Sequence, residues 1–191
     1  MRHVARLLLA GALALGTVHV ADAANAKPKV FKLTSSAFRD GGKLQLKHAG
    51  NNKSNPNCLG ENISPPLSWK NPPAGTKSFL LLMFDPDGRA PAGVSHWVAY
   101  GIPASVTGFA EAEVSKESKK YVGGSSLMKL PHYFGPCTPP NTDWHHYTFT
   151  LVATDLEPDA LKPGLTREEL IKAVEGHTKG SAGLIGRFKH P

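Results

Sequence analysis

Cysteine, charged residues and recurrent motifs are all scarce in this sequence. Two cysteines among 191 residues are too few for a disulfide-dense scaffold or a four-cysteine zinc site. Charged residues make up 19%, which is low for a disordered chain, and 40% hydrophobic residues are enough for a core. The 19 glycines and 16 prolines argue against a helical bundle. The length fits one compact domain.

Signatures of catalysis are also missing. The chain contains no His-Glu-x-x-His and no Cys-x-x-Cys pattern, which are common zinc-binding arrangements. It also lacks the Gly-x-Ser-x-Gly sequence that carries the nucleophile of many hydrolases. We therefore expect no enzymatic activity, no metal and no cofactor.

Charge of one sign is in modest excess, with 22 Lys and Arg against 15 Asp and Glu. Lys119-Lys120 is the only adjacent basic pair, and arginines do not alternate with aromatic residues. A nucleic-acid groove would need a basic stripe, so we expect diffuse solubilising charge and no nucleic-acid partner.

The first 23 residues have the features of a secretory signal peptide. Arg2 and Arg6 precede an apolar stretch over residues 7–20, and Ala21-Asp22-Ala23 has the small-x-small pattern of a cleavage site, with Ala24-Asn25-Ala26 as a second candidate. The alternative, a membrane anchor, needs about 20 apolar residues. We expect residues 1–23 to be cleaved, leaving one domain over residues 24–191. This domain would be periplasmic or secreted, without a stable membrane anchor.

The remaining chain is predicted to be mainly β, in the α+β class. An almost continuous apolar run over residues 78–85 indicates a central strand buried on both faces. Further strands are expected over residues 94–102 and 144–154, and shorter outer strands over 30–33 and 43–46.

One late helix is predicted to lie against the sheet. Thr166 and Glu169 have the spacing of a capping box, and Leu165 and Leu170 that of a hydrophobic staple. The apolar face is expected to consist of Leu170, Ile171 and Val174, and Gly176 to end the helix.

Unusual polar residues occur at the ends of three predicted strands. Asp85-Pro86-Asp87-Gly88 follows the central strand, and strand alternation places Asp85 on the same face as Met83. The alternative is a plain turn, which these residue types also favour. Alternation also places His96 on one face with Val98, Tyr100 and Ile102, with Trp97 opposite. The alternative to a ligand-binding role is that His96 is a structural group with its hydrogen bonds satisfied.

The third strand begins after the loop Gly135-Pro136-Cys137-Thr138-Pro139-Pro140. Alternation places His145 and Tyr147 on one face with Phe149, and His146 on the other. Gly135 permits close backbone approach to a ligand, and the prolines stiffen the loop. If these strand ends meet, imidazole, phenol and backbone donors would form a small anion pocket.

These segments together resemble the phosphatidylethanolamine-binding protein family. The resemblance rests on four motifs in order, Asp85-Pro86-Asp87, His96-Trp97 followed by Ile102-Pro103, the Gly135-Pro136-Cys137 loop, and His145-His146-Tyr147. The early segment over residues 58–69 is similar to the bacterial Raf-kinase-inhibitor-like branch, and the match runs from about Phe31 to Phe188.

The resemblance implies a β-sandwich with a large central antiparallel sheet and a few peripheral helices. It also implies a cavity at the sheet's end for phosphate-like anions and phospholipid head groups. Asp85 and Asp87 would line this cavity, Asp85 either orienting His96 or receiving an ammonium group. His96, His145 and Tyr147 would donate to the anion. The remaining implied wall is the backbone around Gly135 and Pro136.

Two features of the chain bear on this implied pocket. Residues 123–132 differ from the Asn/Asp-Gly-rich loop typical of the family, which leaves ligand size and access open and raises His132 as a further site residue. The resemblance places Cys58 and Cys137 near the same rim, where export would favour a disulfide. The alternative is two separate buried cysteines.

The leading functional hypothesis is therefore a binding protein for a phosphate-containing small ligand or a phospholipid head group. The alternative is a protein-interaction module that inhibits a kinase or a protease, as some members of the family do. In that case the pocket or its rim would contact a protein partner.

Overall fold

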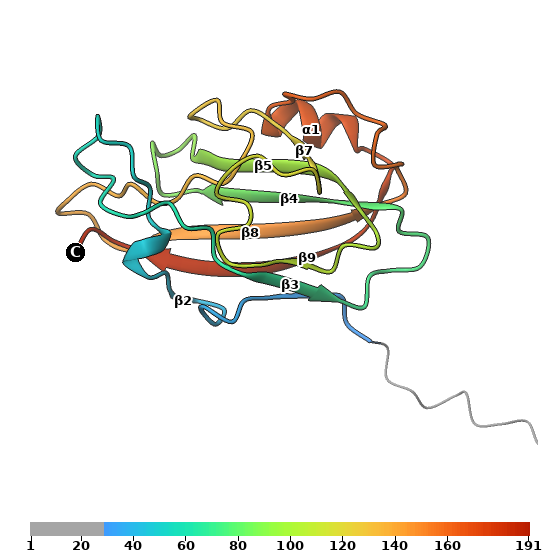
Figure 1. Cartoon of the computed structure of the whole chain (residues 1–191), viewed down its shortest axis with the longest axis horizontal. Coiled ribbons are helices and arrows are strands. Elements are labelled where there is room, and N and C mark those ends of the chain that lie inside the picture. The colour runs from blue at the N-terminus through green and yellow to red at the C-terminus, as the bar shows by residue number, and fades with distance from the viewer. Residues whose placement is uncertain (1–28) are drawn as a thin grey trace, which may run out of the picture.

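The computed structural model describes residues 29–191 and has two β-sheets packed face to face (Figure 1). The predicted signal peptide over residues 1–23 lies outside this part of the chain. The larger sheet has the order β2-β9-β8-β4-β5-β7, and the smaller one the order β1-β3-β6. The expected mainly-β fold with a large central sheet is confirmed.

The strands of the larger sheet are antiparallel to their neighbours except for β2, which pairs with β9 in parallel. They are β2 (Gly42–Lys43), β4 (Ser78–Asp85), β5 (Val94–Pro103), β7 (Val122–Gly123), β8 (His145–Thr154) and β9 (Thr178–Phe188). The smaller sheet consists of β1 (Lys32–Thr34), β3 (Leu67–Lys70) and β6 (Gly108–Phe109). The described residues also form a 3₁₀ helix η1 (Leu46–His48) and the helix α1 (Arg167–Ala173).

The three long strands that sequence patterns predicted are present, but the longest strand was missed. β9 carries Gly180, Gly183 and Gly186, which weaken its β-propensity and hide its alternation. Gly186 is needed for packing, because a Cβ there would lie 2.8 Å from Leu44. The short outer strands are shifted: the predicted strand over 43–46 ends at Lys43.

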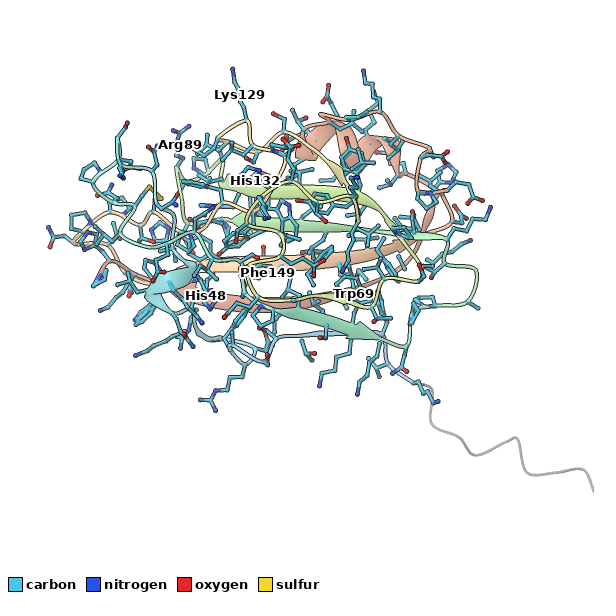
Figure 2. The ribbon with its side chains drawn as sticks, viewed as in Figure 1. His48, Trp69, Arg89, Lys129, His132 and Phe149 are labelled. Atoms are coloured by element: carbon cyan, nitrogen blue, oxygen red, sulfur yellow. A yellow bond between two sulfur atoms is a disulfide. The ribbon has the colours of Figure 1, made fainter. Side chains whose placement is uncertain are left out.

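Two apolar clusters hold the layers together. The sandwich core lies between the sheets and includes Trp97, Trp69 and Phe149, of which the last two are labelled in Figure 2. On the other face of the larger sheet, a second cluster, here called the helix-side cluster, joins strand residues such as Val98 to Leu170 of α1. Each layer therefore buries an apolar face, as a stable sandwich requires.

The helix α1 begins with the predicted capping box. Thr166 accepts a hydrogen bond from the Glu169 amide at 3.2 Å, and the Glu169 carboxylate accepts one from the Thr166 amide at 2.9 Å. Leu170 and Val174 are buried, but Ile171 is 41% exposed, so its predicted place on the packed face was wrong. The spacing of four residues between Leu170 and Val174 defines the buried stripe, and Ile171 lies beside it.

Candidate functional site: a cavity at the ends of three neighbouring strands

The order of the strands explains why the polar motifs meet. β4 lies between β8 and β5 and runs antiparallel to both. The end of β4 at Asp85 is therefore next to the beginning of β5, near His96, and the beginning of β8, at His145. These three side chains come from residues up to 60 apart in sequence.

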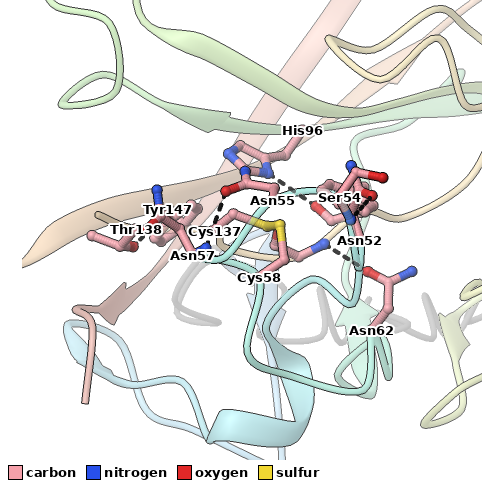
Figure 3. Close-up of a disulfide and its surroundings, with 12 residues drawn as sticks. Asn52, Ser54, Asn55, Asn57, Cys58, Asn62, His96, Cys137, Thr138 and Tyr147 are labelled. Carbon is pink, nitrogen blue, oxygen red and sulfur yellow. Dashed lines mark hydrogen bonds between the residues drawn. A yellow bond between two sulfur atoms is a disulfide. The ribbon is translucent and has the colours of Figure 1, made fainter. Parts of the chain in front are cut away.

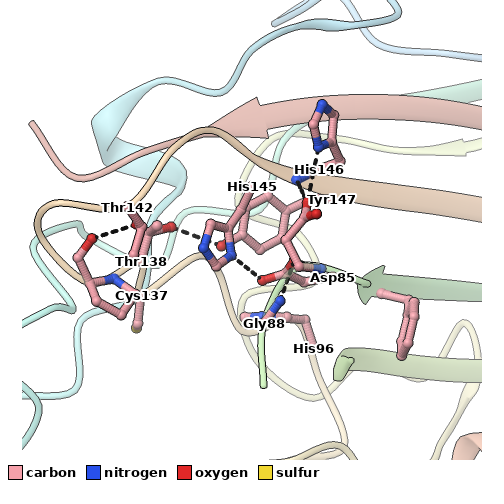
Figure 4. Close-up of polar contacts among 12 residues, drawn as sticks. Asp85, Gly88, His96, Cys137, Thr138, Thr142, His145, His146 and Tyr147 are labelled. Atoms are coloured by element: carbon pink, nitrogen blue, oxygen red, sulfur yellow. Dashed lines mark hydrogen bonds and ion pairs between the residues drawn. The ribbon is translucent and has the colours of Figure 1, made fainter. Parts of the chain in front are cut away.

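Asp85 is the most constrained group of this site (Figure 4). Its side chain is only 4% exposed. One carboxylate oxygen accepts hydrogen bonds from the amides of Asp87 at 2.9 Å and Gly88 at 3.1 Å. The other accepts one from Nδ1 of His145 at 2.8 Å. Asp85 thus forms the turn expected of its motif and also orients His145, rather than His96.

The bond to Asp85 fixes which nitrogen of His145 is available to a ligand. Because an ionised carboxylate can only accept, Nδ1 of His145 carries a proton, and Nε2 remains for another partner. His145 is 9% exposed and lies on the face of Tyr147, as the alternation predicted. Their rings are stacked with centroids 6.4 Å apart.

His96 lies on a different face from the predicted one, and a β-bulge is the reason. In the ladder between β4 and β5, Met83 pairs with Trp97 and Phe84 with Ser95, so His96 has no partner. Its ring contacts Tyr147 edge-on, with centroids 5.1 Å apart, on the side of the sandwich core. A second irregularity at Gly101, whose φ is +60°, moves Ile102 to that side as well.

His96, the second histidine of the site, is also buried and is held by a hydrogen bond of its own. Nδ1 of His96 donates to the Phe134 carbonyl at 3.0 Å, again leaving Nε2 free. Burial lowers the pKa of His96 below its ordinary value, against the opposing effect of this carbonyl. His96 is therefore neutral at pH 7, when Nε2 accepts rather than donates a hydrogen bond.

Tyr147 completes the set of buried polar groups. Its hydroxyl lies 3.0 Å from the hydroxyl of Thr138, and burial raises its pKa. The phenol therefore stays protonated at all physiological pH values, so it retains a proton with which to donate. One ring thus contacts both histidines and keeps a donor beside them.

These groups line a cavity of about 400 Å³. Among the predicted site residues it is lined by Asp85, Asp87, His96, His145 and Tyr147. Further lining residues that were not predicted as site residues from the sequence include Asn55, Asn57, Arg89 and Thr138. Arg89 is exposed and extends outward from the loop after β4 (Figure 2). Leu127 and Met128 belong to the divergent loop over residues 123–132, whereas His132 does not line the cavity.

Gly135 and Pro136 were expected in the wall, but the cavity is lined by their neighbours Phe134 and Cys137. Gly135 packs against another loop instead, so closely that a Cβ there would collide with the His48 carbonyl oxygen. Its amide donates to the Asn62 side chain at 2.8 Å. The glycine therefore permits close contact between two segments of the protein.

Cys58 and Cys137 form the predicted disulfide and are not two separate buried cysteines (Figure 3). Their Cα atoms are 4.4 Å apart although 79 positions separate them in sequence. The bridge attaches the segment that carries Asn55 and Asn57 to the Gly-Pro-Cys loop. One wall of the cavity is therefore covalently closed.

Asp87 stands at the outer side of the cavity with His146 as its partner. Its carboxylate accepts hydrogen bonds from Nδ1 of His146 at 2.9 Å and from the His146 amide at 2.8 Å. Partial burial favours a higher pKa for Asp87, but these two hydrogen bonds outweigh it and lower the pKa. Both side chains are more than 40% exposed.

The described residues contain neither a metal-ligand cluster nor a membrane-spanning helix. Among residues 29–191 no three His, Cys, Asp or Glu side chains are grouped as ligands of a metal ion would be. In the same part of the chain, no helix combines the length and the apolar character needed to cross a bilayer.

Comparison with known proteins now identifies the family. The family model for phosphatidylethanolamine-binding protein matches residues 34–189. A UPF0098 protein of Methanothermobacter thermautotrophicus is 38% identical over 82% of this chain and 97% of its own length. LppC of Mycobacterium tuberculosis, named a lipoprotein, is 32% identical over 88% of this chain and 78% of its own.

A solved structure agrees with these sequence matches. The crystal structure of YbcL from Escherichia coli, described as a member of the mammalian PEBP family, superposes with a TM-score of 0.75 at 26% identity. The superposition covers 83% of this chain and 98% of YbcL. On the strength of the family match and these relatives, the chain belongs to the phosphatidylethanolamine-binding protein family.

Proposed function

We propose that this protein binds a phosphate-containing small ligand or a phospholipid head group in the cavity at the ends of β4, β5 and β8. The observation that carries the proposal is the buried Asp85–His145 pair, whose carboxylate accepts three hydrogen bonds. It fixes the orientation of the His145 ring in the cavity wall and leaves Nε2 for a ligand. Asp85 thereby serves to orient the His145 ring against which a ligand would bind.

The remaining cavity groups suit a phosphate. Tyr147 stays protonated, and Arg89 at the rim offers a guanidinium, which binds phosphate through two parallel hydrogen bonds. Neutral His96 accepts a hydrogen bond from the P–OH group of a phosphate monoester, or donates one once it is protonated itself. The volume of about 400 Å³ admits a head group. These are the properties of a binding protein, and we propose no reaction.

Calorimetric titration with phosphoethanolamine, glycerol phosphate and inorganic phosphate tests this function. We expect saturable binding that is lost in His96→Ala and in His145→Ala. His177→Ala is a matched control, because His177 pairs with Asp155 at 2.8 Å outside the cavity. Unchanged binding in both cavity variants would contradict the proposal. A preference for the two esters over inorganic phosphate identifies a head-group site, and equal affinity identifies a phosphate site.

We also propose that the protein acts outside the cytoplasm, in the periplasm or after secretion. Three observations support this location: the signal-like residues 1–23, the disulfide Cys58–Cys137 and the relative named a lipoprotein. Intact-mass measurement of the native protein tests it. A chain that begins at Ala24 or Lys27 is expected, corresponding to the two cleavage candidates, and a mature cytoplasmic protein that retains residues 1–23 would refute it.

A further inference from the structure

Three cations gather around one indole ring at the cavity end of the larger sheet. Trp144, directly before β8, has Lys43 Nζ at 5.0 Å, Lys189 Nζ at 5.3 Å and the Arg187 guanidinium carbon at 5.5 Å from its ring centroid. These residues come from β2, from β9 and from the chain after β9. The sequence predicted a diffuse distribution of basic residues, and this prediction is wrong here, because segments distant in sequence bring three cations together.

The sheet register explains this convergence. Lys43 pairs with Arg187 across β2 and β9, and His146 pairs with Arg187 across β8 and β9. Side chains of paired residues share a face, so these three project from the side opposite the sandwich core. Ile185, two residues before Arg187, is on this face and is 36% exposed. We call Lys43, Trp144, Ile185, Arg187 and Lys189 the Trp144 patch.

The outer face of the larger sheet is covered at one end and open at the other. The helix-side cluster, with Leu170 of α1 and Val174 directly after it, covers the end away from the cavity. The Trp144 patch lies at the opposite end, where β8 begins and β9 ends (Figure 1). It adjoins the cavity, because Trp144 precedes the cavity residue His145 and because His146 bonds Asp87.

The cations of the patch have no direct carboxylate partner within the described residues. None of the ion pairs found there includes Lys43, Arg187 or Lys189. The nearby carboxylates have other partners: Asp40 accepts from the Ile185 amide, and Asp143 from the Trp144 amide. Three cations held close together repel one another, so an external anion would stabilise the arrangement.

We propose that the Trp144 patch docks the protein reversibly on an anionic phospholipid bilayer. An indole ring and an exposed isoleucine favour the water–lipid boundary, and the three cations complement the phosphates of acidic lipids. The patch is an open sheet face with apolar and cationic groups together, which fits a lipid surface better than a nucleic-acid groove. Docking brings the nearby cavity close to the head groups.

Vesicle partition measures the proposed docking directly. The full mature protein is sedimented with phosphatidylcholine vesicles, with and without phosphatidylglycerol. We expect binding to the anionic vesicles only, weakening as salt is raised. Because each basic residue near such a surface is worth about 1 kcal/mol, Lys43→Gln with Lys189→Gln should lower the partition coefficient about 30-fold.

A matched charge control exists on the smaller sheet. Lys32 and Lys70 are exposed and pair across β1 and β3, and neither lies over an indole ring in the described structure. Lys32→Gln with Lys70→Gln removes the same net charge and should retain most of the binding. Equal losses in the two double variants would show that only net charge matters and would overturn the proposal.

Fluorescence locates the contact. Trp69 and Trp97 are 4% and 0% exposed, so a blue shift on addition of anionic vesicles reports Trp144, and Trp144→Phe should abolish it. Binding of polyglutamate without binding of anionic vesicles would assign the patch to an acidic protein partner instead. The docking surface can be separated from the cavity: the Lys43/Lys189 variant should retain phosphoethanolamine binding while it loses vesicle binding.

Discussion

Two His–Asp pairs stand side by side in this protein and differ in almost every physical respect. Asp85–His145 and Asp87–His146 have Nδ1-to-carboxylate distances of 2.8 and 2.9 Å and come from the same two chain segments. The first is on the face of the sandwich core, with 4% of the Asp and 11% of the His side chain exposed, whereas the corresponding values of the second are 42% and 47%. Strand alternation in β8 separates the two histidines, and Asp85 ends β4 whereas Asp87 lies in the turn that follows it.

Burial therefore determines what each pair contributes. In the buried pair, desolvation makes every unmet hydrogen bond costly, so each partner holds the other in one orientation. In the exposed pair, water competes for the same groups and salt screens them. Similar distances in a structure thus correspond to different energies.

The largest effect on the free energy of unfolding is expected from removing the Cys58–Cys137 disulfide in the wall of the cavity that contains the buried pair. The disulfide closes a loop of 79 positions, and the entropy of such a closure is worth about 4.5 kcal/mol at most. Cys58→Ala with Cys137→Ala should lower the free energy of unfolding by about 2–4 kcal/mol in chemical denaturation. Reductant should destabilise the wild type and leave this variant unaffected. A loss below about 1 kcal/mol would show that packing alone holds the wall.

The next effect tests the buried pair itself. Asp85→Ala leaves the amides of Asp87 and Gly88 and Nδ1 of His145 without their acceptor, and such losses cost about 3 kcal/mol. Thermal and urea unfolding measure the change. Asp85→Asn should cost less, because its amide oxygen still accepts from the two backbone groups. Equal losses in both variants would show that the charge matters more than the turn.

An intermediate effect is expected on how the free energy of unfolding depends on pH. The pKa of His96 is lowered by burial in the folded protein, so below about pH 6.5 the unfolded chain binds more protons than the folded one. The free energy of unfolding therefore decreases as the pH is lowered. The slope is at most about 1.4 kcal/mol per pH unit for one proton. His96→Gln should reduce the slope between pH 7 and 5. His48 and His132, whose pKa values burial also lowers, account for a remaining slope. An unaltered slope would place the proton elsewhere.

The smallest effect is expected at the exposed pair. Asp87→Ala should change the free energy of unfolding by less than about 1 kcal/mol, and raised salt should reduce the difference. The pKa of Asp87 is lowered by the His146 hydrogen bonds, so its contribution is present above about pH 4 and is lost as pH falls through the folded-state value. A loss as large as that of Asp85→Ala would end the distinction between the pairs.

Strong local signals made part of this structure predictable. The continuous apolar run that ends at Asp85 predicted β4 to the residue, and Thr166 with Glu169 predicted the capped helix. The alternation in β8 correctly separated His145 from His146. Each of these patterns depends on neighbours within about ten residues, which a single sequence records.

Features that depend on distant contacts could not be predicted in this way. The bulge at His96 exists only against β4, and the glycines of β9 become favourable only where Leu44 and Pro73 pack on them. Likewise, Arg89 and Asn55 carried no local signal of a cavity, since separate loops bring them to its wall. The cluster around Trp144 needed the β2–β9 register.

Because of the bulge, His96 lines the cavity without taking part in a cross-strand pair of the sheet. A residue without a cross-strand partner can be exchanged while the pairs on either side, Met83 with Trp97 and Phe84 with Ser95, remain in place. Position 96 is therefore where evolution or protein engineering can alter the ligand preference of the cavity at the least cost to the sheet. Relatives with a different residue there should retain the fold and differ in what they bind.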